Sequence, residues 1–161
     1  SNGRYLILFA SRGGNTERMA NEIGEQLDCD LLEIEPEVAH DNDYDAMLER
    51  AQEELAAIRQ GNYPPVKTSV ENFDDYDIVF IGYPIWWGIA AWPVDNFVKG
   101  NDFTGKTVIP FCTSSSSGLG DSGNLLEEMA GTGDWQEGHR FSSGASDADA
   151  ADWVASLNLN K

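Results

Sequence analysis

The chain is organised around Ser11-Arg12-Gly13-Gly14-Asn15-Thr16, which joins an apolar run at Tyr5–Phe9 to a helical pattern at Glu17–Leu27. A polar, glycine-containing loop between a strand and a helix points several backbone N–H groups and the positive end of the helix at one place. The hydroxyl and amide side chains of the loop add further donors, and the two glycines allow close approach of the backbone. The stretch therefore predicts a phosphate site, with a ligand-free turn capped by Asn or Thr as the alternative.

The chain is strongly acidic: its 161 residues include ten Lys and Arg against 28 Asp and Glu, a formal net charge of −18. Such a surface repels nucleic acid and favours basic protein partners, although solubility or adaptation to salt would explain the charge equally well. The length fits a single domain over residues 1–161. No apolar run approaches the roughly 20 residues of a membrane span, so we expect a cytoplasmic protein. Because the sequence does not begin with Met, a removed export signal stays an alternative.

The cysteines and histidines do not form a recognisable chemical motif. Cys29 and Cys112 lie in apolar, strand-like segments and are interpreted as buried core thiols. His40 and His139 stand alone in polar surroundings and are interpreted as surface residues. The sequence has no CxxC and no Cys/His cluster, so we predict neither a metal site nor a catalytic residue.

Strand and helix patterns alternate along the rest of the chain. The expected elements are a strand at Asp30–Glu35, a helix at Tyr44–Ile58, a strand at Ile78–Gly82, a helix from Pro93, a strand at Thr107–Thr113, a helix through Leu125–Met129, a weak strand near His139–Ser143 and a helix at Asp147–Leu157. This alternation predicts an α/β protein with a mainly parallel sheet. In such sheets ligands bind outside the carboxyl ends of the strands. The loops after the first, third and fourth predicted strands should therefore meet at one edge.

The segment Tyr83-Pro84-Ile85-Trp86-Trp87-Gly88 follows the third predicted strand. Two adjacent tryptophans cannot both point into one core, because neighbouring side chains diverge. At least one should lie on a loop surface or in a cleft, where it would form a stacking surface for a flat aromatic ligand. A subunit interface or exposed aromatic residues without a ligand are the alternatives.

Two nucleotide-binding motifs occur in the wrong context. Gly100–Thr107 matches the G-x4-G-K-T loop of nucleotide hydrolases, but a helix precedes it and a strand follows, which inverts the required order. Gly118–Gly123 matches the dinucleotide pattern G-x-G-x-x-G, but several serines separate it from the preceding strand. We reject the first match and keep the second as a minor alternative.

Taken together, the motifs resemble the flavodoxin family over residues 5–157. Ser11–Thr16 is similar to the family's FMN phosphate loop, roughly [ST]-x-[TS]-G-N-T, except that Gly13 stands where Thr or Ser is usual. Gly82–Gly88, and Pro110–Ser114 with its Ser/Gly-rich continuation, resemble a bacterial flavodoxin-like subfamily. The resemblance implies a three-layer α/β sandwich, with a five-stranded parallel sheet in the order 2-1-3-4-5 and helices on both faces.

The resemblance also implies FMN as the cofactor, held at the C-terminal edge of the sheet. The residues expected to hold its phosphate are Ser11, Arg12, Gly13, Gly14, Asn15 and Thr16. Those expected around the flavin ring are Pro84, Ile85, Trp86, Trp87 and Gly88, with Trp87 favoured for stacking. Those expected at the ribityl chain and pyrimidine side are Thr113, Ser114, Ser115, Ser116 and Gly118.

Three functions are compatible with this reading. The favoured one is electron transport, in which a flavoprotein docks redox partners that have a basic face. The second is an FMN-dependent oxidoreductase acting on quinones or nitro compounds with NAD(P)H, and the third is a flavin-free interaction domain. The sequence shows no Lys/Arg cluster for the phosphates of a nicotinamide cofactor and no general acid or base. Both observations favour the carrier.

Overall fold

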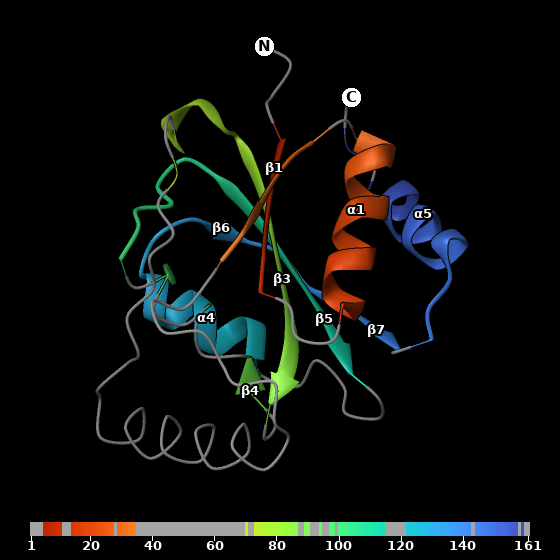
Figure 1. The fold of residues 1–161 in the computed structure, drawn as a ribbon. Helices are drawn as coiled ribbons and strands as arrows, with labels where there is room; N and C mark the ends of the chain where they lie inside the picture. The colour runs from red at the N-terminus through yellow and green to blue at the C-terminus, as the bar shows by residue number, and fades with distance from the viewer. Residues whose placement is uncertain are drawn as a thin grey trace.

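The first apolar run forms β1 (Tyr5–Phe9), which is buried along its whole length as a strand covered on both faces should be. The computed structural model describes residues 5–10, 14–27, 29–34, 70, 73–86, 89–90, 94, 97–98, 100–114, 122–142, 144–157 and 159. In this part of the chain, α1 (Asn15–Leu27) and α5 (Asp147–Ser156) lie on one face of a central sheet, and α4 (Ser122–Ala130) lies on the other (Figure 1).

The sheet has the predicted strand order. Its other parallel strands are β2 (Asp30–Glu33), β3 (Ile78–Trp86), β5 (Thr107–Ser114), β6 (Asp134–Trp135) and β7 (His139–Ser142). The order is β2-β1-β3-β5, and both β6 and β7 pair with β5. Because β6 and β7 share the fifth position, the expected order 2-1-3-4-5 is confirmed. The short β4 (Ile89–Ala90) adds an antiparallel pair at the end of β3.

Alternation along β3 divides the core into two layers. Val79 and Ile81 point to the α4 side and pack in a cluster with Leu126. Phe80 points the other way and packs with Met19 of α1 and Trp153 of α5. The amphipathic pattern of α1 predicted this inward face.

The fifth position of the sheet is occupied by two short strands, and Pro110 gives the reason. Gln136 N–H donates to the carbonyl of Val108 at 2.8 Å, and β7 joins the sheet only at the pairing of Phe111 with His139. The backbone N–H and C=O of residues two apart in a strand point to the same neighbouring strand. The nitrogen of Pro110, like the carbonyl of Val108, therefore points to the sheet edge between these contacts. Proline has no N–H to donate, so the ladder is interrupted at residues 136–138.

Several boundaries differ from the predicted ones. β2 ends at Glu33 rather than residue 35, and β3 continues past Gly82 to Trp86. The two-residue β6 was not predicted at all. The predicted helix at Tyr44–Ile58 lies outside the described residues, as does the start of the helix at Pro93.

Cys112 is a buried free thiol as predicted, and burial raises its pKa to about 12, against a smaller lowering by Arg140. Cys29 likewise forms no disulfide with a described residue, but it is only half-buried. The interpretation of His139 as an isolated surface residue is wrong. Its ring is half-buried and stacks on Trp153, at 5.1 Å between centroids and 17° between planes. His40 lies outside the described residues.

None of the helices in the described ranges has the length and apolar character needed to cross a lipid bilayer.

Candidate functional site

The ends of three parallel strands meet the start of α1 at one edge of the sheet (Figure 1). Ala10, just after β1, donates its N–H to the carbonyl of Gly82 in β3 at 2.9 Å. Farther along β3, Pro84 lies opposite Thr113 of β5. The described ends of the three predicted loops therefore converge, as the strand order requires.

Gly14 and Asn15 form the turn into α1. Gly14 has φ +91°, a conformation that side-chain-bearing residues rarely adopt, and a Cβ placed there would meet no atom of the described residues within 4 Å. The first helical bond of α1 runs from Arg18 N–H to the carbonyl of Gly14 at 3.0 Å. The first-turn amides of a helix have no acceptor inside it, so the turn offers donors to an anion. Ser11, Arg12 and Gly13 lie outside the described residues.

A buried hydrogen bond joins the first turn of α1 to the end of β5. Thr16 Oγ1 lies 2.7 Å from Thr113 Oγ1, and the two residues are 1% and 4% exposed. Either hydroxyl can be the donor, so at most one hydroxyl hydrogen of the pair remains for a ligand. Two residues expected at different parts of the cofactor are thus held together, and a phosphate contact by Thr16 is expected mainly through its backbone N–H.

The tryptophan segment is a hairpin rather than the expected loop. Pro84, Ile85 and Trp86 continue β3, and Ile85 and Trp86 pair with Ala90 and Ile89. Aromatic and β-branched residues suit such an extension, as they favour strands. Tyr83, just before them, is fully buried, and its hydroxyl lies 2.9 Å from Ser122 Oγ at the start of α4. Trp87 and Gly88 lie outside the described residues, so the stacking residue stays a prediction.

Arg140 is a residue of this edge that the sequence analysis missed. Its Nε donates to Ser114 Oγ at 3.0 Å, and Nη2 donates to the carbonyl of Ser114 at 3.1 Å. The guanidinium thereby fixes the point where the serine-rich segment leaves β5. A single arginine in a weak strand pattern carries no signal of this role. Ser115, Ser116 and Gly118 lie outside the described residues.

Gly100–Thr107, the match to the loop of nucleotide hydrolases that its inverted context excludes, lies at the opposite edge of the sheet, where β5 begins. Lys106 is buried, and its Nζ donates to the carbonyls of Phe73 and Tyr76 at 2.7 Å each. The same Nζ lies 4.6 Å from the centroid of the Phe73 ring. Because these contacts occupy the amine, Lys106 is not placed to bind a phosphate.

A family model described as flavodoxin matches residues 4–157. The chain belongs to the flavodoxin family. Comparison of this flavodoxin with curated proteins gave no match.

Solved structures resemble this flavodoxin along nearly its whole length. A candidate flavoprotein from Bacteroides eggerthii is 30% identical, with a TM-score of 0.84, and the match covers 99% of this chain and 100% of that chain. One from Bacteroides uniformis is 29% identical, with a TM-score of 0.85, 96% of this chain and 99% of that chain being covered. A flavoprotein from Lactobacillus acidophilus, solved in complex with FMN, is 24% identical, with a TM-score of 0.71 and coverage of 95% and 99%. The last likeness shows the shared fold.

Proposed function

We propose that this flavodoxin binds FMN at the C-terminal edge of its sheet and transfers electrons between protein partners. One observation carries the proposal: the first turn of α1 and the end of β5 are joined at that edge by the 2.7 Å contact between Thr16 and Thr113. This contact places helix-terminal amides beside the hydroxyl-rich segment that begins at Thr113. The solved complex of a structurally similar flavoprotein with FMN supports the choice of ligand.

The described residues fit an FMN phosphate through neutral donors. Arg18, the cation in the first turns of α1, is directed elsewhere: its Nη1 donates to the carbonyl of Ala145 at 2.6 Å and lies 3.9 Å from Asp147. A Cβ built at Gly14 would meet no atom of the described residues within 4 Å, which is compatible with close approach of a ligand to this turn. In a chain of net charge −18, amides and the helix dipole can hold an anion without adding a cation.

The residues assigned to FMN keep the division expected from the sequence. Residues 11–16 would hold the phosphate, residues 84–88 would border the ring, and Thr113, Ser114, Ser115, Ser116 and Gly118 would contact the ribityl chain and pyrimidine side. FMN, when bound, supplies the electron-transfer chemistry. The protein would orient the ring, exclude water and set its potential through the surrounding charge. The surplus of carboxylates opposes adding an electron, which makes the reduced cofactor a stronger donor.

A carrier is favoured over a reductase by the chemistry of the described edge. Thr16, Thr113 and Ser114 contribute hydroxyl groups, and Cys112, with its pKa near 12, is a neutral thiol at physiological pH. The hydroxyl groups can bind and position a cofactor, and neither they nor the buried thiol offers a general acid or base near neutral pH. The acidic surface suits docking of a basic redox partner.

Titration of the cofactor-free protein with FMN tests the proposal. Saturable quenching of flavin fluorescence with one FMN per chain is expected, and absence of binding would refute it. Reduction then separates the two flavin functions. A carrier should be reduced by a reductase partner or dithionite and stay oxidised with NADH or NADPH alone. Rapid bleaching by either nucleotide would identify a reductase instead.

A further inference from the structure

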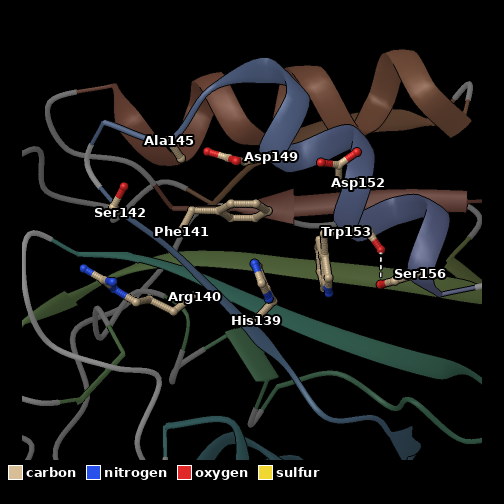
Figure 2. Close-up of a pocket in the computed structure, with 9 residues that line it drawn as sticks. All are labelled: His139, Arg140, Phe141, Ser142, Ala145, Asp149, Asp152, Trp153 and Ser156. Atoms are coloured by element: carbon tan, nitrogen blue, oxygen red, sulfur yellow. Dashed lines mark hydrogen bonds between the residues drawn. The ribbon is translucent and has the colours of Figure 1, made fainter.

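A pocket of about 430 Å³ lies between β7 and α5, outside the residues assigned to FMN (Figure 2). Its volume falls within the usual range for small-ligand pockets, roughly 300–1,000 Å³. Phe141 and Trp153 are buried at its base, at 2% and 8% exposure, and His139 stands between them. Asp149 and Asp152 project over these rings from the exposed side of α5.

The ring of His139 contacts two aromatic rings. It stacks on Trp153, and its ring meets Phe141 edge-on, with 4.7 Å between centroids and 71° between planes. Neither of its ring nitrogens has a hydrogen-bond partner among the residues that the structure describes. Burial lowers the pKa of His139, with a smaller opposing effect of Asp149, so the ring is neutral at pH 7 and can accept a hydrogen bond.

The polar groups around this pocket are mainly acceptors. Asp152 has no hydrogen bond among the described residues, and Asp149 uses Oδ2 to accept from Ser146 N–H at 2.9 Å, which leaves its second oxygen. Ser156 donates its hydroxyl to the carbonyl of Trp153 at 2.6 Å, so its oxygen still has acceptor capacity. The one cation of the lining, Arg140, points away from the carboxylates and is held by Ser114 (Figure 2).

We propose that this pocket receives an arginine side chain of a basic redox partner. Two carboxylates and a neutral imidazole match a planar cation that has several N–H donors, and Arg is more weakly hydrated than Lys. The position suits a docking contact, because β7 pairs with β5 up to Ser114, where a segment assigned to FMN begins. The proposal rests on the proposed electron-transfer function, since it specifies one contact with the partner.

The test is a titration of the FMN-loaded protein with three short peptides that differ at two positions, which carry arginine, lysine or the neutral isostere citrulline. NMR follows the ring protons of His139 and the indole N–H of Trp153 at a constant 0.15 M ionic strength. We expect saturable shifts with the arginine peptide, weaker binding of the lysine peptide and none of the citrulline peptide. Equal binding of lysine and arginine, or no shift at these two rings, would overturn the proposal.

Matched charge variants separate the pocket from the general acidity of the chain. Asp152→Asn should weaken arginine-peptide binding about two- to fivefold, the usual effect of losing one exposed ion pair. Glu127→Gln removes the same charge from an exposed residue of α4, on the opposite face, and should change binding by less than that. If both variants weaken binding equally, the peptide recognises net charge and the pocket assignment is wrong.

The same samples keep this proposal distinct from the proposed function. Asp152→Asn should bind FMN as tightly as the unsubstituted protein, because the residue lies outside the cofactor segments. The peptide titration is repeated on the cofactor-free protein, so that binding at the pocket is measured independently of FMN binding. Failure of FMN to bind would refute the carrier function, whereas failure of the arginine peptide in a protein that binds FMN would refute only the pocket.

Discussion

Two regions of this chain carry a phosphate-loop sequence pattern, and they lie at opposite edges of one sheet. At Ser11–Thr16 the pattern runs from a strand into α1, with Gly14 at φ +91° and no atom of the described residues within 4 Å of a Cβ built there. At Gly100–Thr107 the pattern runs into the start of β5, and its lysine is buried against the carbonyls of Phe73 and Tyr76. Glycines, a cation and hydroxyls therefore favour an anion site only where a helix begins at the right end of them.

The largest expected effect on stability is at the edge of the sheet where β5 begins and Lys106 is buried. Lys106→Met should lower the free energy of unfolding by about 3 kcal/mol, because two buried carbonyls lose a donor, and hydrogen bonds to charged groups contribute about 1.5–3 kcal/mol each. Chemical denaturation measures the loss. FMN affinity of the folded variant should be unchanged. A large loss of FMN affinity would mean that the two edges are not independent.

A matched pair of glycine variants compares the edges directly. Gly14 and Gly105 have φ of +91° and +80°, and a Cβ at either would meet nothing within 4 Å. Gly14→Ala and Gly105→Ala should therefore each cost about 1–2 kcal/mol of stability from backbone strain alone. Only Gly14→Ala should also weaken FMN binding, measured by flavin fluorescence. Equal FMN affinity for the two variants would remove Gly14 from the proposed site.

A smaller effect is expected at the contact that joins α1 to β5. Thr16→Val, Thr113→Val and the double variant form a cycle in which the coupling energy should be about 1 kcal/mol, typical of one buried neutral hydrogen bond. The FMN affinities of the three variants should fall in parallel with the loss of this contact. A coupling energy near zero would show that the bond does not hold the two segments together.

The smallest expected effect concerns His139, on the α5 side of the sheet. Because burial lowers its pKa in the folded protein, the unfolded chain takes up the proton first as pH falls below about 6.5. Stability should decrease as pH falls from 6.5 towards the depressed value, and then level off. His139→Gln should remove this part of the pH dependence in denaturation curves. An unchanged slope would assign it to other groups.

The α/β class and the mainly parallel sheet could be predicted because strand and helix patterns alternate along the chain. The apolar run of β1 and the apolar stripe of α1 belong to that pattern, whereas the strand order comes from the resemblance to the flavodoxin family. The broken edge could not be predicted in this way, because a two-residue strand at Asp134–Trp135 has no periodicity. Its cause, Pro110, lies in a different strand.

The parts of the candidate site that depend on the order of strands and helices could be predicted from the sequence. The parts that depend on single side-chain contacts could not. The turn at Gly14–Asn15 and its place at the sheet edge followed from the strand-to-helix order. Arg140 reaches Ser114 only because β7 pairs with β5, and that pairing is not visible in the local sequence. His139 and Phe141 are two residues apart in β7 and therefore share one face, which the structure packs against Trp153 of α5. The sequence alone does not say which layer covers that face.

The break opposite Pro110 also affects how the molecule meets copies of itself. An uninterrupted outer strand would present a row of backbone donors and acceptors on which another chain could build, the usual start of sheet-mediated aggregation. Here that edge consists of one strand of two residues and one of four, separated at residues 136–138. The missing N–H of Pro110, in the strand next to the central one, thus shortens the template that the outer strands offer and opposes aggregation through this edge.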